Sequence, residues 1–322
     1  MNQLSVDLKE ILAEIRHCAI DITQQEWQEL GDAIDKFLPN PLNPFFLLPM
    51  VTGIGCHGKR EELTRTAAVV TLLDVCFRIM DDCADRDDPT SLDRQVGMGR
   101  AIHYAMAINA IATQELLNFA IAPPSSSDLI PYYFQSFLQV CQGQDRDLKT
   151  NVNSLQEYQD LIKLKTLPAY QFATVIGACV AAADPQQLNA AAEFGQHLGW
   201  MTQMLDDIES IWFPTVENQR EIEKKTFPVL LGLSLDHPNA ERLEKMFHQK
   251  QYHRKTICTL LDEMDIRTRL IHSALNHRDE ALKSLENLPN SEGKAILQIW
   301  LDWYLGQGER LLQPIEPDSV SP

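Results

Sequence analysis

Long stretches without glycine or proline constrain the fold of this chain more than any other feature of its sequence. Its 322 residues include 14 glycines and 17 prolines, and most of the prolines lie in short segments between these stretches. So few turn-forming residues argue against β-sandwiches and barrels and favour helices. Apolar and amphipathic patterns predict helices at residues 63–80, 98–121, 132–142, 155–182, 188–212 and 254–285. We therefore expect an all-α protein, a single large helical bundle around a central cavity.

The expected bundle forms one domain over residues 1–312. Its last part, from about 242 to 312, is polar and is predicted to form a C-terminal helical cap. The tail at 313–322, rich in proline and serine, is predicted to be disordered. A hydrophobic content of 44% is enough to fill the core of such a bundle.

The charge and the cysteines limit the partners and the compartment. A net charge of −17 argues against a nucleic-acid partner and suits surface carboxylates or bound cations. No apolar stretch approaches the roughly 18 residues of a membrane span, and the N-terminus does not resemble a signal peptide. Seven cysteines without CxxC spacing indicate reduced thiols. We expect a cytoplasmic protein with no integral membrane segment.

A first carboxylate cluster, Asp81-Asp82-Cys83-Ala84-Asp85, ends the apolar pattern at 63–80. Asp81 and Asp85 are four residues apart, so they share one helix face and repel each other unless a cation lies between them. Carboxylate oxygens together with substrate phosphates are the usual ligands of Mg²⁺. The alternative is a solvated acidic helix end.

A second cluster, Gln203 to Ser210, lies within an apolar helical pattern and contains Asp206 and Asp207. Unpaired charge is costly at such a place, which favours a bound cation over a surface salt bridge. Both clusters lie toward the C-terminal ends of apolar helices. They can face each other across the cavity and bind several Mg²⁺ ions and, through them, a diphosphate.

Two lysine–threonine segments add positive charge: Lys165-Thr166 and Lys224-Lys225-Thr226. A lysine ammonium is a compact charge suited to phosphate, although each of these residues can also be an ordinary surface lysine. The segment 143–148, with Gln144 and Asp147, reads in isolation as a polar helix end.

Together these segments resemble the trans-isoprenyl diphosphate synthases, the polyprenyl synthetase family of class I isoprenoid enzymes. The ordered match covers roughly residues 45–235. It consists of Gly58-Lys59-Arg60, DDxxD at 81–85, GQxxDL at 143–148, Tyr158 with Lys165-Thr166 and Ile176-Gly177-Ala178, Gly199 with Gln203 and Asp206-Asp207, and Lys224-x-Thr226-x-Pro228.

The resemblance implies the all-α isoprenoid synthase fold, a homodimer and three Mg²⁺ ions that promote ionisation of an allylic diphosphate to a carbocation. It implies Mg²⁺ ligation by Asp81, Asp85 and Asp206, with Asp82 and Asp207 as supporting carboxylates. Lys59, Lys165, Lys224 and Gln203 would bind diphosphate, while Gln144, Asp147, Gln203 and Ser210 would lie near the metal ions.

The chain departs from the family where isopentenyl diphosphate binds. Lys59 is retained, but Glu62 replaces an arginine and Asp74 replaces a histidine or glutamine, and the Arg-Arg pair after DDxxD is missing. A carboxylate beside a diphosphate adds repulsion of about 4 kcal/mol per charge pair at an effective dielectric near 20. We expect isopentenyl diphosphate to bind poorly while ionisation of the allylic substrate survives.

Four functions remain open. The preferred one is a terpene synthase derived from a prenyl synthase and acting on a C15 or C20 substrate. Ser210 supports it, because terpene cyclases of this fold place a metal-binding serine there, although Pro214 replaces their final glutamate. The others are a prenyltransferase with another acceptor, such as a peptide tryptophan, an ordinary prenyl diphosphate synthase, and a non-catalytic helical subunit.

Overall fold

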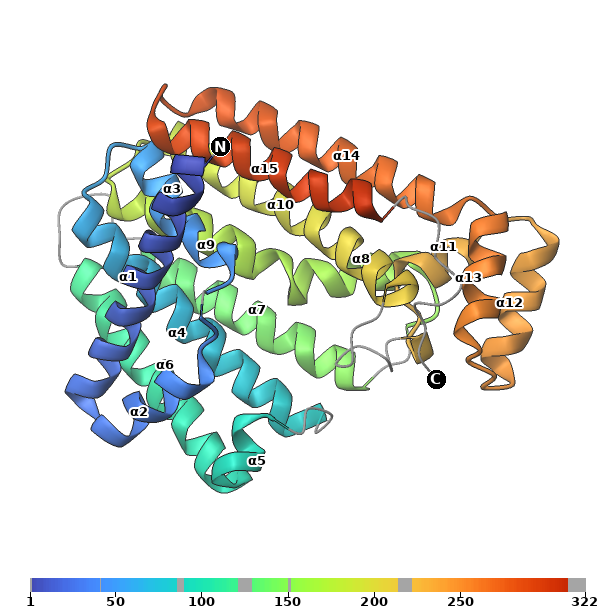
Figure 1. Cartoon of the computed structure of the whole chain (residues 1–322), viewed down its shortest axis with the longest axis horizontal. Coiled ribbons are helices and arrows are strands. Elements are labelled where there is room, and N and C mark those ends of the chain that lie inside the picture. The colour runs from blue at the N-terminus through green and yellow to red at the C-terminus, as the bar shows by residue number, and fades with distance from the viewer. Residues whose placement is uncertain are drawn as a thin grey trace. The chain divides into compact units, whose positions relative to one another are not determined.

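The computed structural model describes residues 2–40, 42–85, 90–120, 129–149, 152–213 and 222–311. Throughout these ranges the chain forms helices joined by short segments, and none of it forms a strand (Figure 1). The all-α prediction is confirmed. No helix in the described ranges is long and apolar enough to cross a membrane. The predicted disordered tail at 313–322 lies outside the described residues.

The chain forms two compact units. Unit 1 comprises Met1–Phe134, Phe172–Ala192 and Leu285–Leu297, and unit 2 comprises Gln135–Gln171, Glu193–Ser284 and Gln298–Pro322. Both units are therefore assembled from segments far apart in the sequence. One domain over 1–312 with a cap at about 242–312 stays a prediction.

Unit 1 is built around α4 (Arg60–Asp85), which packs against α1 (Asn2–Glu26), α3 (Leu48–Gly55) and α6 (Met98–Ala120) (Figure 1). The unit also contains α2 (Gln28–Phe37), the 3₁₀ helices η1 (Pro44–Leu47) and η3 (Leu285–Asn287), and α5 (Leu92–Val96). The middle of α4 is buried on all sides from 66 to 73, as expected for a helix that is apolar all round. Asp81 and Asp82 follow about two turns later, after a stretch that includes the exposed Arg78 and Met80.

A glycine permits one close helix contact in unit 1. A Cβ atom at Gly177, on α9 (Leu167–Val180), would lie 1.8 Å from the carbonyl oxygen of Pro49 on α3. A side chain at this position would collide with backbone rather than with a movable group. The Ile176-Gly177-Ala178 segment noted in the sequence is thus explained by helix packing.

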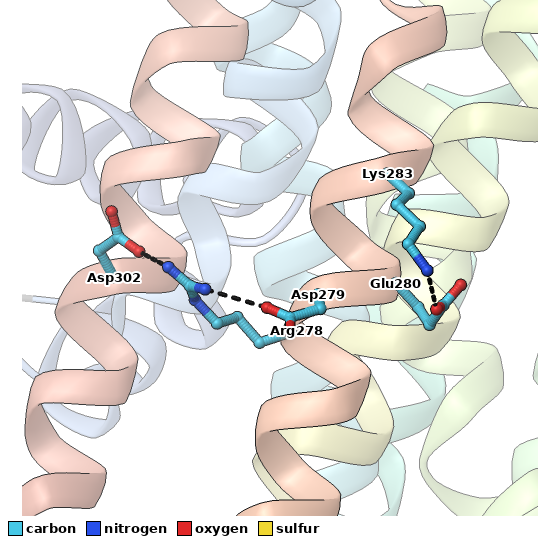
Figure 2. A network of polar contacts seen from close by, with 5 residues as sticks. All are labelled: Arg278, Asp279, Glu280, Lys283 and Asp302. Carbon is cyan, nitrogen blue, oxygen red and sulfur yellow. Dashed lines mark hydrogen bonds and ion pairs between the residues drawn. The ribbon is translucent and has the colours of Figure 1, made fainter.

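Unit 2 contains the later parts of α7 (Leu129–Lys149), α10 (Pro185–Trp212) and α15 (Glu292–Arg310), together with α8 (Leu155–Lys165), α11 (Phe227–Leu233), α12 (Pro238–His248), α13 (Arg254–Glu263) and α14 (Ile266–Ser284). Arg278 of α14 is hydrogen-bonded to Asp279 of the same helix and to Asp302 of α15, which ties these two helices together (Figure 2). Glu280 and Lys283 form a separate ion pair along α14 (Figure 2).

Two predicted helices are each divided. The helix predicted at 155–182 is interrupted at Thr166, because Pro168 lacks a backbone N–H and is tolerated only in the first turn of α9. The helix predicted at 254–285 is interrupted at Met264 and Asp265, where Asp265 adopts the left-handed conformation with φ of 57°. No glycine or proline marks this second break, so the sequence pattern missed it.

Candidate functional site

The first aspartate cluster occupies the last two turns of α4 in unit 1. Asp81 and Asp82 are half-buried, and Asp85 is the final residue of the helix. Because the helix continues through Asp85, the four-residue spacing does place Asp81 and Asp85 on one face. The Asp85 side chain itself lies outside the described part of the structure.

The start and middle of α4 carry further carboxylates. The Lys59 ammonium is 81% exposed and forms an ion pair with Glu62 at 3.2 Å. Asp74 is half-buried, and desolvation raises the pKa of its carboxyl group to about 6, against the opposing effect of Arg78. The Arg78 guanidinium lies 5.1 Å from the centre of the Phe37 ring. Where the resemblance would place a cationic isopentenyl diphosphate site, the chain thus has a lysine paired with a carboxylate and a desolvated carboxyl group.

In unit 2, Asp207 is buried and its carboxylate accepts three hydrogen bonds. The donors are the Tyr158 hydroxyl at 2.8 Å, the Gln203 side-chain amide at 2.8 Å and the Phe227 backbone N–H at 3.1 Å. These donors come from α8, α10 and α11. Asp207 therefore joins three helices, a structural role that the sequence did not reveal.

Asp206 behaves differently from its neighbour. Desolvation, with smaller contributions from the carboxylates of Asp207 and Glu209, raises the pKa of Asp206 to about 7. The residue nevertheless keeps an exposed surface that a cation can reach. An approaching cation stabilises the charged form of a carboxyl group whose pKa is raised in this way, which suits a metal ligand.

Gln203 connects the first lysine–threonine segment, Lys165-Thr166, to this arrangement. Its side-chain oxygen accepts a hydrogen bond from the Thr166 hydroxyl at 2.8 Å, and its amide donates to Asp207. The amide therefore holds the α8–α9 break against α10. This contact explains why threonine follows lysine at 165–166.

Lys165 and Asp147 were both predicted as site residues, and the structure brings them together. The Lys165 ammonium lies 2.5 Å from an Asp147 carboxylate oxygen, and both side chains are about two-thirds buried. Gly143 allows this approach, since a Cβ atom there would lie 2.6 Å from the Lys165 backbone. Gln144, the next residue on α7, is half-buried.

The segment before α11 contains the second lysine–threonine motif. Lys224 is exposed, and the neighbouring Lys225 donates to the Asn153 side chain at 2.9 Å. Thr226 is buried, and its hydroxyl has no hydrogen-bond partner within the described ranges.

Ser210 makes a hydrogen bond within its own helix. It is buried, and its hydroxyl donates to the backbone carbonyl of Asp207, one turn earlier in α10, at 3.0 Å. This contact is local to the helix. It gives no support to the serine-based argument for a terpene cyclase.

Comparison with known families settles the relationship. The family model described as polyprenyl synthetase matches residues 44–264. This chain belongs to the polyprenyl synthetase family. The family prediction from the ordered motifs is therefore confirmed.

Curated relatives are distant. The chain is 26% identical over 180 residues to a geranylgeranyl diphosphate synthase of Sulfolobus acidocaldarius, covering 53% of each protein. It is 25% identical over 162 residues to tryptophan prenyltransferase ComQ of Bacillus subtilis subsp. natto, covering 50% of each. The chain thus spans about half the length of these curated relatives. Both are named for prenyl or prenyl diphosphate chemistry.

Solved structures confirm the fold. The geranylgeranyl pyrophosphate synthetase of Pyrococcus horikoshii matches with a TM-score of 0.80 and 19% identity, over 94% of this chain and 98% of that one. The Corynebacterium glutamicum geranylgeranyl pyrophosphate synthase, solved with calcium and isoprenyl diphosphate, gives 0.78 and 19%, over 97% and 99%. The all-α isoprenoid synthase fold predicted from the motifs is therefore confirmed.

Proposed function

We propose that this chain is a Mg²⁺-dependent enzyme that ionises an allylic prenyl diphosphate without using isopentenyl diphosphate as the acceptor. The observation that carries the proposal is the division between two adjacent carboxylates on α10. Asp207 is satisfied by three hydrogen bonds, whereas the exposed Asp206 has a pKa of about 7 and gains from a bound cation.

The donor set suits Mg²⁺. One or two carboxylates, completed by substrate phosphate oxygens and water, form the coordination sphere that Mg²⁺ usually takes. We assign Asp81, Asp85 and Asp206 as ligands and expect three ions per substrate. Bound Mg²⁺ supplies the charge neutralisation that makes diphosphate a leaving group.

The chain's own residues bind and orient the diphosphate. Lys165 and Lys224 are proposed to hold it, with Lys165 kept in position by Asp147 until substrate arrives. Gln203 acts mainly by fixing Thr166 and Asp207. We keep Asp82, Gln144 and Ser210 as polar residues near the metal ions.

Poor use of isopentenyl diphosphate is supported by unit 1. Lys59, which the resemblance assigns to diphosphate binding, is paired with Glu62, and Asp74 has a desolvated carboxyl group. An incoming diphosphate would have to displace one carboxylate from its lysine and lie near another, both against electrostatic repulsion.

Two fates of the carbocation follow. In a terpene synthase acting on a C15 or C20 substrate, the cation cyclises, loses a proton or is captured by water. In a prenyltransferase it is transferred to an acceptor other than isopentenyl diphosphate, such as a tryptophan side chain. The similarity to tryptophan prenyltransferase ComQ favours this second function, and Asp74 offers a carboxylate for an N–H group of the acceptor. The Ser210 hydrogen bond within α10 gives the first no added support. A cytoplasmic homodimer remains our expectation for either.

Product analysis tests the proposal. Purified protein is incubated with Mg²⁺ and farnesyl or geranylgeranyl diphosphate, with or without isopentenyl diphosphate or a tryptophan-containing peptide. A hydrocarbon or alcohol from the prenyl diphosphate alone identifies a terpene synthase, and a prenylated peptide identifies the transferase. The Asp206→Asn variant should be inactive in both assays. A longer prenyl diphosphate formed only with isopentenyl diphosphate would contradict the proposal.

A further inference from the structure

The C-terminal turn of α10 is held by one stripe of residues on α13. Arg254, Cys258 and Asp262 are spaced four residues apart, so they lie along one face of α13. All three contact the last turn of α10, only four to six residues after Asp206. None of them belongs to the motifs that identified the family.

Arg254 provides the central contact. Its Nη1 donates to the backbone carbonyl of Ser210 at 2.5 Å and to that of Ile211 at 2.8 Å. The last four carbonyls of a helix lack partners within the helix, and their partial negative charge attracts a cation. Arg254 is half-buried, and desolvation lowers its pKa. Its guanidinium thus caps the end of the helix that carries Asp206.

The other members of the stripe extend the cap. The Cys258 thiol lies 3.4 Å from the Ile211 carbonyl oxygen, and the Trp212 indole N–H donates to Asp262 at 3.0 Å. Arg267 of α14 forms an ion pair with Asp262 at 3.3 Å and lies 5.5 Å from the centre of the Trp212 ring. The last three residues of α10, Ser210 to Trp212, therefore each form a hydrogen bond with α13, through a backbone carbonyl or through the indole N–H.

We propose that Arg254 is a positioning residue, which fixes the end of α10 and thereby keeps the Asp206 carboxyl group aligned for Mg²⁺. This inference rests on the proposed function. Arg254 acts through the backbone, because its guanidinium donates to the carbonyl groups of Ser210 and Ile211. Losing the cap lets the last turn of α10 fray, which loosens the helical hydrogen bond from the Ser210 N–H to the Asp206 carbonyl and leaves the Asp206 side chain in mixed orientations.

The test compares Arg254→Met and Arg254→Lys with the control Lys255→Met, which removes a neighbouring exposed charge from the same helix. Binding of Mn²⁺ in the presence of inorganic pyrophosphate is followed by electron paramagnetic resonance, and hydrogen exchange is measured at amides 207–212. We expect Arg254→Met to weaken Mn²⁺ binding about tenfold and to speed exchange at these amides. Arg254→Lys should recover much of the Mn²⁺ affinity and of the protection from exchange. Lys255→Met should have the Mn²⁺ affinity and exchange rates of the wild type.

Steady-state kinetics with the prenyl diphosphate add a second readout. Arg254→Met should raise the Mg²⁺ concentration for half-maximal rate about tenfold, with a much smaller change in KM for the prenyl diphosphate at saturating Mg²⁺. If Arg254→Met does not fold, Trp212→Phe replaces it, since it removes the indole N–H donated to Asp262, together with part of the buried ring, and leaves the Arg254 contacts in place. We expect this variant to weaken Mn²⁺ binding about threefold.

The inference and the proposed function fail in different ways. Wild-type Mn²⁺ affinity and unchanged exchange in Arg254→Met would overturn the inference. Wild-type protein that binds Mn²⁺ with pyrophosphate but converts no prenyl diphosphate would contradict only the proposed function. Wild-type protein that does not bind Mn²⁺ with pyrophosphate would overturn both.

Discussion

Replacing Tyr158 with phenylalanine tests whether Asp207 is a structural link between helices. The change removes one of three donors to a buried carboxylate while the ring keeps its edge contact with Phe227, whose centre lies 4.9 Å away. A hydrogen bond to a charged group contributes roughly 1.5–3 kcal/mol, and no cavity forms. We expect the free energy of unfolding to fall by about 2 kcal/mol.

A double-mutant cycle measured by urea unfolding isolates the contact. Tyrosine-to-phenylalanine replacement at 158 should cost much less stability when Asp207 is already alanine, because the hydroxyl has then lost the Asp207 carboxylate as an acceptor. The coupling energy should be about 2 kcal/mol. Tyr252→Phe, which removes a hydroxyl from a half-buried tyrosine packed on Phe247, should change stability by less than about 0.5 kcal/mol. A coupling below about 0.5 kcal/mol would refute the assigned role of Asp207.

Three further predictions concern charge. In metal-free protein, the raised pKa of Asp206 destabilises the folded state as pH rises above about 4, and this destabilisation is complete above about pH 7. Asp206→Asn should therefore raise the urea midpoint at pH 8 but not near pH 3.5. The same variant should abolish activity. Desolvation and the neighbouring His197 lower the pKa of His277 to about 4, and the Nδ1 atoms of the two rings lie 3.0 Å apart. The stability that this shift contributes is complete above about pH 6.5 and is lost as pH falls toward 4. His277→Gln should therefore flatten the urea-midpoint profile between these pH values, and an unchanged slope would contradict the assignment. Combining Glu62→Arg with Asp74→His restores two family residues and should introduce measurable consumption of isopentenyl diphosphate, detected as a longer prenyl diphosphate; neither single variant should do so.

Most helices could be predicted from the sequence, because helix-breaking glycines and prolines and the apolar periodicity are local features of the chain. The predicted helix at 188–212 matches α10 (Pro185–Trp212) to within three residues, and the one at 98–121 corresponds to α6 (Met98–Ala120). The division at Met264 and Asp265 was missed because a non-glycine residue adopts a left-handed conformation there. Contacts made by later helices determine such a conformation, and no local pattern signals it.

In the candidate site, too, local sequence patterns located residues but did not reveal their contacts with other helices. Sequence reasoning located Asp206 and Asp207 together, since two charges in an apolar helix require an explanation. It gave Asp207 a supporting role near the metal ions but could not foresee its structural contacts. Adjacent residues on a helix point about 100° apart, so one of the pair meets Tyr158 and Phe227 while the other keeps an exposed surface.

Pairing these two carboxylates has a chemical consequence. A buried carboxylate that already accepts hydrogen bonds from three donors gains little from a metal ion. If it turned toward a metal ion, those buried donors would lose their acceptor, which costs free energy. Its negative charge nevertheless raises the pKa of the neighbouring Asp206. The structural aspartate therefore makes the exposed one a better cation ligand without touching the cation. Replacing Asp207 should weaken both the helix junction and metal binding, whereas replacing Asp206 should affect metal binding and leave the junction intact.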